Sequence, residues 1–89
     1  MASYSLWIKA SAAREIEAIE PPKVRRQVVR RIQRISENPR PHGCEKLGGQ
    51  ANRYRVRQGD YRIVYSVQDR ILTVVVVKVG HRRDVYRHL

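Results

Sequence analysis

The chain has 89 residues, of which 42% are apolar, and its 19 lysines and arginines against eight acids give a formal net charge of +11. This length predicts one domain, spanning residues 1–89, with a single modest core. The charge indicates a polyanionic partner, which is a nucleic acid, an acidic protein or an anionic membrane surface. A basic surface that serves only solubility is the alternative.

The single cysteine and the lack of a signal-peptide pattern in the first residues predict a cytoplasmic protein. The single cysteine, Cys44, cannot form an internal disulfide, which fits a reducing compartment. The first seven residues lack the basic and apolar regions of a signal peptide. No apolar run approaches the roughly 18 residues of a membrane-spanning helix. We therefore expect no membrane partner.

The first residues predict a strand followed by a short helix. Residues 4–9 alternate in polarity, which predicts a strand with Leu6 and Ile8 facing inward. Ser11 is expected to cap a helix that ends before Pro21, because a residue that precedes proline avoids the helical region. The apolar residues of this helix are Ala12, Ala13, Ile16 and Ile19.

A second, longer helix is predicted to begin at Pro22, which suits a first helical turn. Its apolar stripe consists of Val24, Val28, Ile32 and Ile35. Basic residues occupy much of the remaining surface, as a solvated face or as a nucleic-acid contact; they are Lys23, Arg25, Arg26, Arg30, Arg31 and Arg34. We expect the two helices to form an antiparallel hairpin that covers one face of a sheet.

Residues 54–65 read as a hairpin of two alternating strands around a two-residue turn at Gly59 and Asp60. One face carries core residues, namely Tyr54, Val56, Tyr61, Ile63 and Tyr65. The other face carries Arg55, Arg57, Arg62 and Val64. The predicted register places Arg57 opposite Arg62, and like charges across a strand pair are destabilising. This arrangement indicates a negatively charged ligand.

The last predicted strand is residues 71–79, which are apolar on both faces as in a central strand beside the hairpin. Gly80 is expected to end it, and the last nine residues form no more than one turn or an extended tail. Residues 38–50 contain breakers and are expected to form a loop. The fold class is therefore α+β: a small domain with an N-terminal strand, a helical hairpin and a mainly antiparallel sheet, whose opposite, concave face carries the arginines.

The chain offers no recognisable metal or cofactor site, so we expect neither. The eight acids are scattered, which disfavours a paired-carboxylate Mg²⁺ site. His42 and Cys44 supply two potential ligands, whereas zinc needs three or four from the protein. A structural or loop role for both residues is the more economical reading.

The arginines suit chemistry at a phosphodiester. Guanidinium groups bind phosphate bidentately and stabilise charge that develops at phosphorus. RNA carries its own nucleophile, the 2′-hydroxyl, so its cleavage needs only positioning, charge stabilisation and proton transfer. Tyr86 could accept the 2′ proton if neighbouring cations lower its pKa, while Arg82 or His81 could assist at the 5′ oxygen. The alternatives are an ordinary packing aromatic for Tyr86 and a solvated turn residue for His81.

Three motifs, residues 54–57, 59–65 and 79–86, make the sequence resemble the RelE/ParE superfamily of type II toxins, and specifically its RelE-like mRNA interferase branch. Asn38-Pro39 and Lys46-Leu47 also fit. The resemblance implies a RelE-like fold (β-α-α-β-β-β) and metal-independent cleavage of mRNA in the ribosomal A site. Its catalytic residues would be Arg62, Arg82 and Tyr86, and its phosphate-binding residues Arg55, Arg57, Arg83 and His81.

This sequence departs from the best-known member in having arginines for two lysines, a shorter segment between Gly80 and Tyr86, and a short tail. The resemblance also implies partners: the ribosome, mRNA and an acidic, partly disordered RelB-like antitoxin in a hetero-oligomer. Two other functions remain open. One is a ParE-like DNA gyrase inhibitor, which needs no catalytic tyrosine, and the other is a basic binding module without activity.

Overall fold

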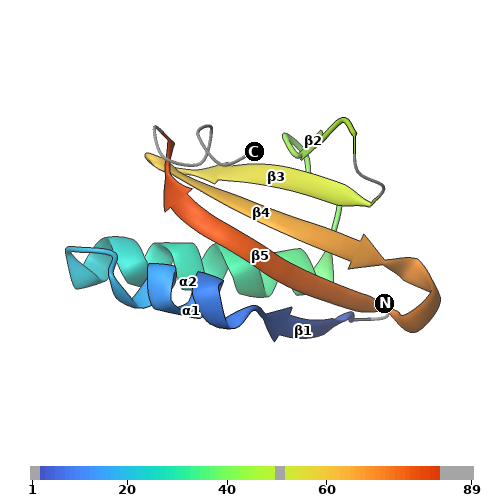
Figure 1. Ribbon diagram of the computed structural model, residues 1–89, viewed down its shortest axis with the longest axis horizontal. Helices are drawn as coiled ribbons and strands as arrows, with labels where there is room; N and C mark the ends of the chain where they lie inside the picture. Colours follow the sequence, from blue (N-terminus) through green and yellow to red (C-terminus); the bar gives the residue numbers. More distant parts are fainter. Residues whose placement is uncertain (1–2, 50–51, 83–89) are drawn as a thin grey trace.

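The computed structural model describes residues 3–49 and 52–82. In chain order the elements are β1 (Ser5–Ile8), α1 (Ala10–Glu17), α2 (Pro22–Glu37), β2 (Glu45–Lys46), β3 (Arg53–Gln58), β4 (Tyr61–Gln68), the 3₁₀ turn η1 (Asp69–Ile71) and β5 (Thr73–His81). Both helices lie below one face of a single twisted sheet (Figure 1). The predicted α+β class with an N-terminal strand and two helices is confirmed.

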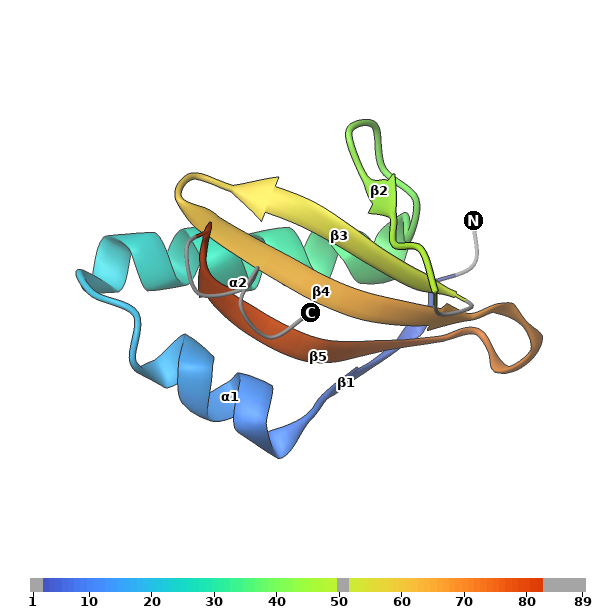
Figure 2. The same ribbon diagram turned by 45° about the horizontal axis from the view of Figure 1, so that its top comes forward.

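The five strands follow the order β1-β5-β4-β3-β2. Only β1 and β5 are parallel, and the other neighbours are antiparallel, so the sheet is mainly antiparallel as predicted. Figure 2 shows the long strands β3, β4 and β5 at the centre, with β1 and the short β2 at the two edges. The chain therefore places its last strand between its first strand and the hairpin.

The β3–β4 hairpin has the register that the alternation predicted. Arg57 pairs with Arg62, Val56 with Ile63 and Tyr54 with Tyr65 across the two strands. Gly59 begins the turn at φ +60°, a conformation that glycine adopts without steric cost. The rings of Tyr54 and Tyr65 stack with centroids 6.0 Å apart. The turn residues and the apolar alternation together fix which side chains share a face.

The core lies between the helices and one face of the sheet. Helical residues in it are Ala12, Ile16, Val28, Ile32 and Ile35, with Ile19 just after α1. Sheet residues in it are Tyr54, Val56, Ile63, Tyr65, Val67, Val74, Val76 and Val79. The Tyr65 hydroxyl is buried and donates a hydrogen bond to the Pro39 carbonyl at 2.7 Å, which ties the end of α2 to β4.

The first elements differ from the prediction in one cap and in the burial of one residue. Ser11 does not cap α1, because the helix begins at Ala10, and Lys9 at the N-cap makes no side-chain hydrogen bond. Leu6 packs against the core as predicted, and Ile8 lies on the same side of β1, level with the core residue Val76, but is 40% exposed at the sheet edge. The α2 prediction is confirmed, with a proline in its first turn and its apolar stripe on the core.

The ends of β5 also differ from the prediction. Ile71 belongs to η1, Leu72 follows it at φ +46°, and both are exposed, so the strand begins at Thr73. Gly80 does not end the strand, because β4 continues alongside and pairs Arg62 with Gly80 and Tyr61 with His81. The predicted loop contains β2, in which Glu45 pairs with Arg55 and Lys46 with Tyr54. Two residues are too few for alternation to reveal a strand.

None of the helices in the described ranges is long and apolar enough to cross a membrane.

Candidate functional site

Arg55, Arg57 and Arg62 lie on the face of the sheet opposite the helices, and we call these three residues the arginine face. Their neighbours Val56 and Ile63 point into the core, which places the arginines on the other side of β3 and β4. Pairing arranges this face in two rows. One row is Arg57, Arg62 and Gly80, and the other is Arg55, Val64 and Lys78.

Arg57 and Arg62 lie directly opposite each other, but their side chains have different environments. Arg57 donates from Nε to the Gly59 carbonyl at 2.9 Å, so the turn holds it in place. Arg62 Nη1 is buried and has no hydrogen-bond acceptor among the described residues. A buried N–H without an acceptor costs free energy, so this position is suited to receive an anion. Gly80, beside Arg62 in the same row, contributes no side chain.

The third arginine is held by an element that the sequence did not reveal. Arg55 Nη2 lies 2.8 Å from Glu45 Oε2, and the Arg55 side chain is largely buried while that of Glu45 is exposed. Glu45 is part of β2 and pairs with Arg55 in the sheet. The edge strand therefore fixes the Arg55 guanidinium through a charge-assisted hydrogen bond.

Arg82 joins this end of the sheet through its backbone. Its N–H donates to the Asp60 carbonyl at 2.8 Å, and its side chain is exposed. The chain after β5 therefore starts beside the β3–β4 turn that carries Arg57. Arg83 and Tyr86, the remaining predicted site residues, lie outside the described residues.

The structure does not bring His81 to the arginine face. His81 pairs with Tyr61 in the sheet, and their rings meet edge to face with centroids 5.8 Å apart. Tyr61 packs against the core cluster, so His81 lies on the helix side of the sheet. There it lines a cavity of about 380 Å³ together with Glu15, Ile19 and Lys78.

Lys78 is a cation near the site that sequence reasoning did not select. The register places it in the row of Arg55, but its Nζ lies 2.7 Å from Glu15 Oε2 of α1. The other carboxylate oxygen of Glu15 accepts from the Val79 backbone N–H at 3.0 Å. The alternation that leads from Gly80 to Lys78 is a signal that could have identified this residue.

His42 and Cys44 show no metal-binding arrangement within the described ranges. No group of three or more histidine, cysteine or acidic residues comes together there. Cys44 is a free, half-buried thiol packed against the core, and His42 is exposed.

Comparison with known proteins supports the same fold and relates the chain to toxins. Residues 8–86 match the family model described as the ParE toxin of the type II toxin–antitoxin system parDE. The chain is 31% identical over 85 residues to Toxin RelG of Mycobacterium tuberculosis, covering 94% of this chain and 97% of that protein.

Solved structures agree with these sequence matches. The toxin–antitoxin complex RelBE2 of Mycobacterium tuberculosis contains a chain with 28% identity and a TM-score of 0.78, covering 91% of this chain and 100% of that one. The intact E. coli RelBE complex gives 30% identity and a TM-score of 0.77, covering 89% of this chain and 96% of that one. The chain belongs to the RelE/ParE superfamily of toxins from type II toxin–antitoxin systems.

Proposed function

We propose that this toxin is a RelE-type endoribonuclease that cuts mRNA in the ribosomal A site through the 2′-hydroxyl of the RNA. The observation that carries this proposal is Arg62. Its buried Nη1 lacks an acceptor among the described residues and lies opposite Arg57 on the arginine face. A phosphodiester supplies the acceptor oxygens and the negative charge that such a pair of guanidinium groups favours.

In this reaction the 2′ oxygen attacks phosphorus, the bond from phosphorus to the 5′ oxygen breaks, and the leaving oxygen takes up a proton. The products are a 2′,3′-cyclic phosphate and a 5′-hydroxyl. Arg62 stabilises the charge that builds up on the phosphoryl oxygens. Arg55, held by Glu45, and Arg57, held by the turn, orient the phosphate for in-line attack.

Proton transfer is assigned from the resemblance. Tyr86 accepts the 2′ proton, which requires neighbouring cations to lower the pKa of its phenol from the ordinary value of about 10. Arg82, whose backbone is bound to the β3–β4 turn, assists at the 5′ oxygen, and Arg83 binds phosphate. The scattered acids support a mechanism in which the arginines take the role that a metal ion has in other nucleases.

An acidic RelB-like antitoxin is the proposed partner, in a cytoplasmic hetero-oligomer. The solved RelBE and RelBE2 structures are toxin–antitoxin complexes, and a net charge of +11 favours an acidic partner here. Such a partner would cover the arginine face and compete with RNA for Arg62.

A second candidate, a gyrase inhibitor, is favoured by one finding: the matching family model is that of the ParE toxin. An inhibitor of this kind would leave message intact and would not depend on Tyr86.

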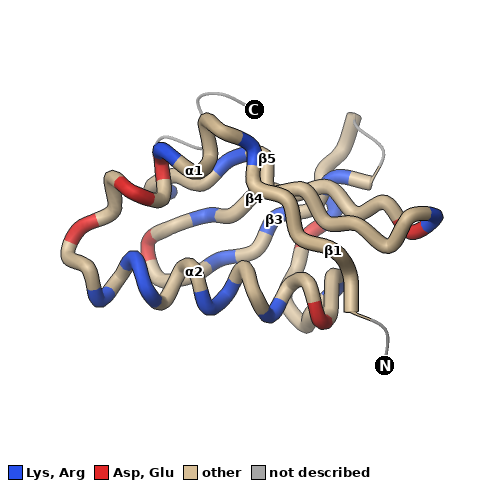
Figure 3. The backbone as a smooth tube through the Cα atoms, turned by 90° about the horizontal axis from the view of Figure 1, so that it is seen from below, with Lys and Arg blue, Asp and Glu red and all other residues tan. Residues whose placement is uncertain are grey.

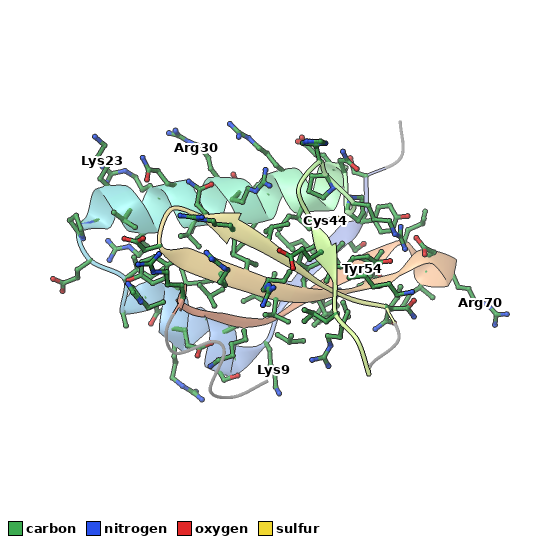
Figure 4. The ribbon with its side chains drawn as sticks, turned by 90° about the horizontal axis from the view of Figure 1, so that it is seen from above. Lys9, Lys23, Arg30, Cys44, Tyr54 and Arg70 are labelled. Atoms are coloured by element: carbon green, nitrogen blue, oxygen red, sulfur yellow. The ribbon has the colours of Figure 1, made fainter. Side chains whose placement is uncertain are left out.

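The deciding experiment maps RNA ends after induced expression. A nuclease produces cuts within codons of ribosome-bound mRNA, ending in 2′,3′-cyclic phosphates, and the double variant Arg62→Ala plus Tyr86→Phe abolishes both cleavage and growth arrest. Arg70→Ala is the matched control, because Arg70 projects from the end of the sheet opposite the β3–β4 turn (Figure 4). Intact message together with inhibited supercoiling by purified gyrase would select the second candidate.

A further inference from the structure

A second cluster of arginines lies on α2, away from the arginine face. Lysines and arginines recur along the whole of α2 (Figure 3), and Lys23 and Arg30 project from its outer side (Figure 4). A small cavity of about 120 Å³ lies where this helix meets the end of β3. We call this cavity the α2 pocket; it is lined by Gln27, Arg30, Arg31, Arg34 and Gln58.

The α2 pocket concentrates positive charge that the described part of the chain does not neutralise. Arg31 and Arg34 are three residues apart on the helix and Arg30 and Arg34 are four apart, spacings at which like charges repel. Within residues 3–49 and 52–82, the ion pairs are Arg40–Asp69, Arg55–Glu45 and Lys78–Glu15, and none includes these three arginines.

Arg31 provides an independent sign of a missing acceptor. Its Nε is buried and has no hydrogen-bond partner among the described residues, as is also true of Arg62 Nη1. Arg31 is half-buried and lines the α2 pocket. An anion in this cationic pocket would offer an acceptor to the buried donor of Arg31.

The donors favour phosphate over carboxylate. Three guanidinium groups and the amides of Gln27 and Gln58 reach the pocket from two elements. A tetrahedral phosphate presents oxygens out of plane toward both elements, whereas the lone pairs of a carboxylate lie in one plane. Gln58 also directly precedes the Gly59–Asp60 turn and follows Arg57, so the pocket adjoins the arginine face along β3.

We propose that the α2 pocket binds a backbone phosphate of RNA, as a contact separate from the arginine face. With this site, the protein binds a longer stretch of RNA. The RNA runs from the arginine face, around the edge of β3, to α2. Binding at this site does not depend on RNA cleavage.

The test uses the full chain and a short single-stranded 2′-O-methyl RNA of about a dozen nucleotides, which lacks the nucleophile and cannot be cut. In ¹H–¹⁵N NMR spectra, the Arg31 Nε–Hε signal should shift and saturate at the RNA concentration that saturates binding. Arg34→Ala should weaken binding and lower the slope of log K against log salt by about 0.7, the value for one phosphate contact.

Arg26→Ala is the matched control, because Arg26 is exposed on the same helix but does not line the pocket. It should leave the Arg31 shift intact, and the spectrum of free Arg34→Ala establishes that this variant is folded. An Arg31 signal that stays fixed while RNA binds would overturn the proposal, as would a shift produced by an acidic peptide but not by RNA. A protein that binds in this way yet cuts no message would contradict the nuclease and leave the pocket supported.

Discussion

Arg62 pairs with Arg57 across two strands, and one of its nitrogens is buried without an acceptor among the described residues. Both features oppose folding of the isolated chain, because like charges repel and the buried donor loses its bond to water. Residues that serve a ligand often reduce stability in this way. The free energy of unfolding and the activity should therefore respond in opposite directions at this position.

Replacing Arg62 with methionine tests this conflict. Arg62→Met keeps an unbranched apolar stem and removes the charge, so the free energy of unfolding should rise by about 0.5–1 kcal/mol while RNA cleavage is lost. Arg55→Met is the control, since it breaks the pair with Glu45 and should not stabilise the chain. Urea denaturation measures both. Equal losses of stability in the two variants would mean that Arg62 supports the fold.

At the scale of elements, sequence reasoning succeeded where the pattern is local. The Gly59–Asp60 turn and the alternation around it fixed the Arg57–Arg62 pairing, and the apolar stripe fixed α2. It failed where a contact depends on an element too short to show a pattern or on a residue far along the chain. Glu45 reaches Arg55 through a two-residue strand, and Glu15 reaches Lys78 across 63 positions.

The side of the sheet on which His81 lies could not be predicted for a different reason. Gly80 was expected to end the strand, so nothing in the sequence assigned His81 to a side of the sheet. Pairing with β4 extends β5 through His81, and a bulge at Val64 and Tyr65 shifts the alternation along it. The side chain consequently lies with Tyr61 and the helices. Of the predicted site, the register of the arginines could be read from the sequence, whereas the side of the sheet that His81 takes could not.

Glu15 stabilises the part of β5 that extends beyond β1. The pairing of β1 ends at Val76, and the Glu15 carboxylate accepts the Val79 N–H in place of a strand. Glu15→Ala should lower the free energy of unfolding by about 1–2 kcal/mol and speed hydrogen exchange at Val79. Glu15→Gln keeps an acceptor and should preserve most of that protection. Glu17→Ala, exposed on the same helix, should change neither quantity. Equal exchange rates in the Gln and Ala variants would refute the capping role.

A polar network lies at the end of the sheet away from the β3–β4 turn. There the Asp69 carboxylate accepts hydrogen bonds from Arg40 and from the Tyr4 hydroxyl. The hydrogen bond from Arg40 holds the pKa of Asp69 below its ordinary value. Its stabilising effect is therefore full above the unfolded pKa of about 4 and is lost as pH falls through the lower folded pKa.

Asp69→Asn should consequently be less stable than the native chain near pH 7, and the two should converge only as pH falls below the lowered folded pKa of Asp69. Denaturation midpoints at several pH values measure the difference. Because the pair is exposed, added salt should also reduce it. A difference that persists unchanged at acid pH would show that the Asp69 charge is not its source.

At the scale of the whole molecule, repulsion dominates the electrostatics. The net charge is +11, and the ion pairs within the described ranges all have partly exposed members, which limits what they contribute. Self-repulsion of this kind destabilises the compact state and is screened by salt, because the Debye length falls from about 30 Å at 0.01 M to about 10 Å at 0.1 M. In a protein whose stability depends on surface ion pairs, salt would instead lower the free energy of unfolding, because it screens the attraction within those pairs.

The isolated chain should therefore become more stable as sodium chloride rises from about 0.01 M to about 0.1 M, measured as the urea midpoint. An uncleavable RNA at constant ionic strength should stabilise it further, because a ligand that binds only the folded state adds to the free energy of unfolding. The double variant Arg30→Gln plus Arg34→Gln, with a net charge lower by two (11 − 2 = 9), should gain less from salt. If stability falls with salt instead, attraction within the described ion pairs outweighs the repulsion, and the chain would not need a polyanion to offset its charge.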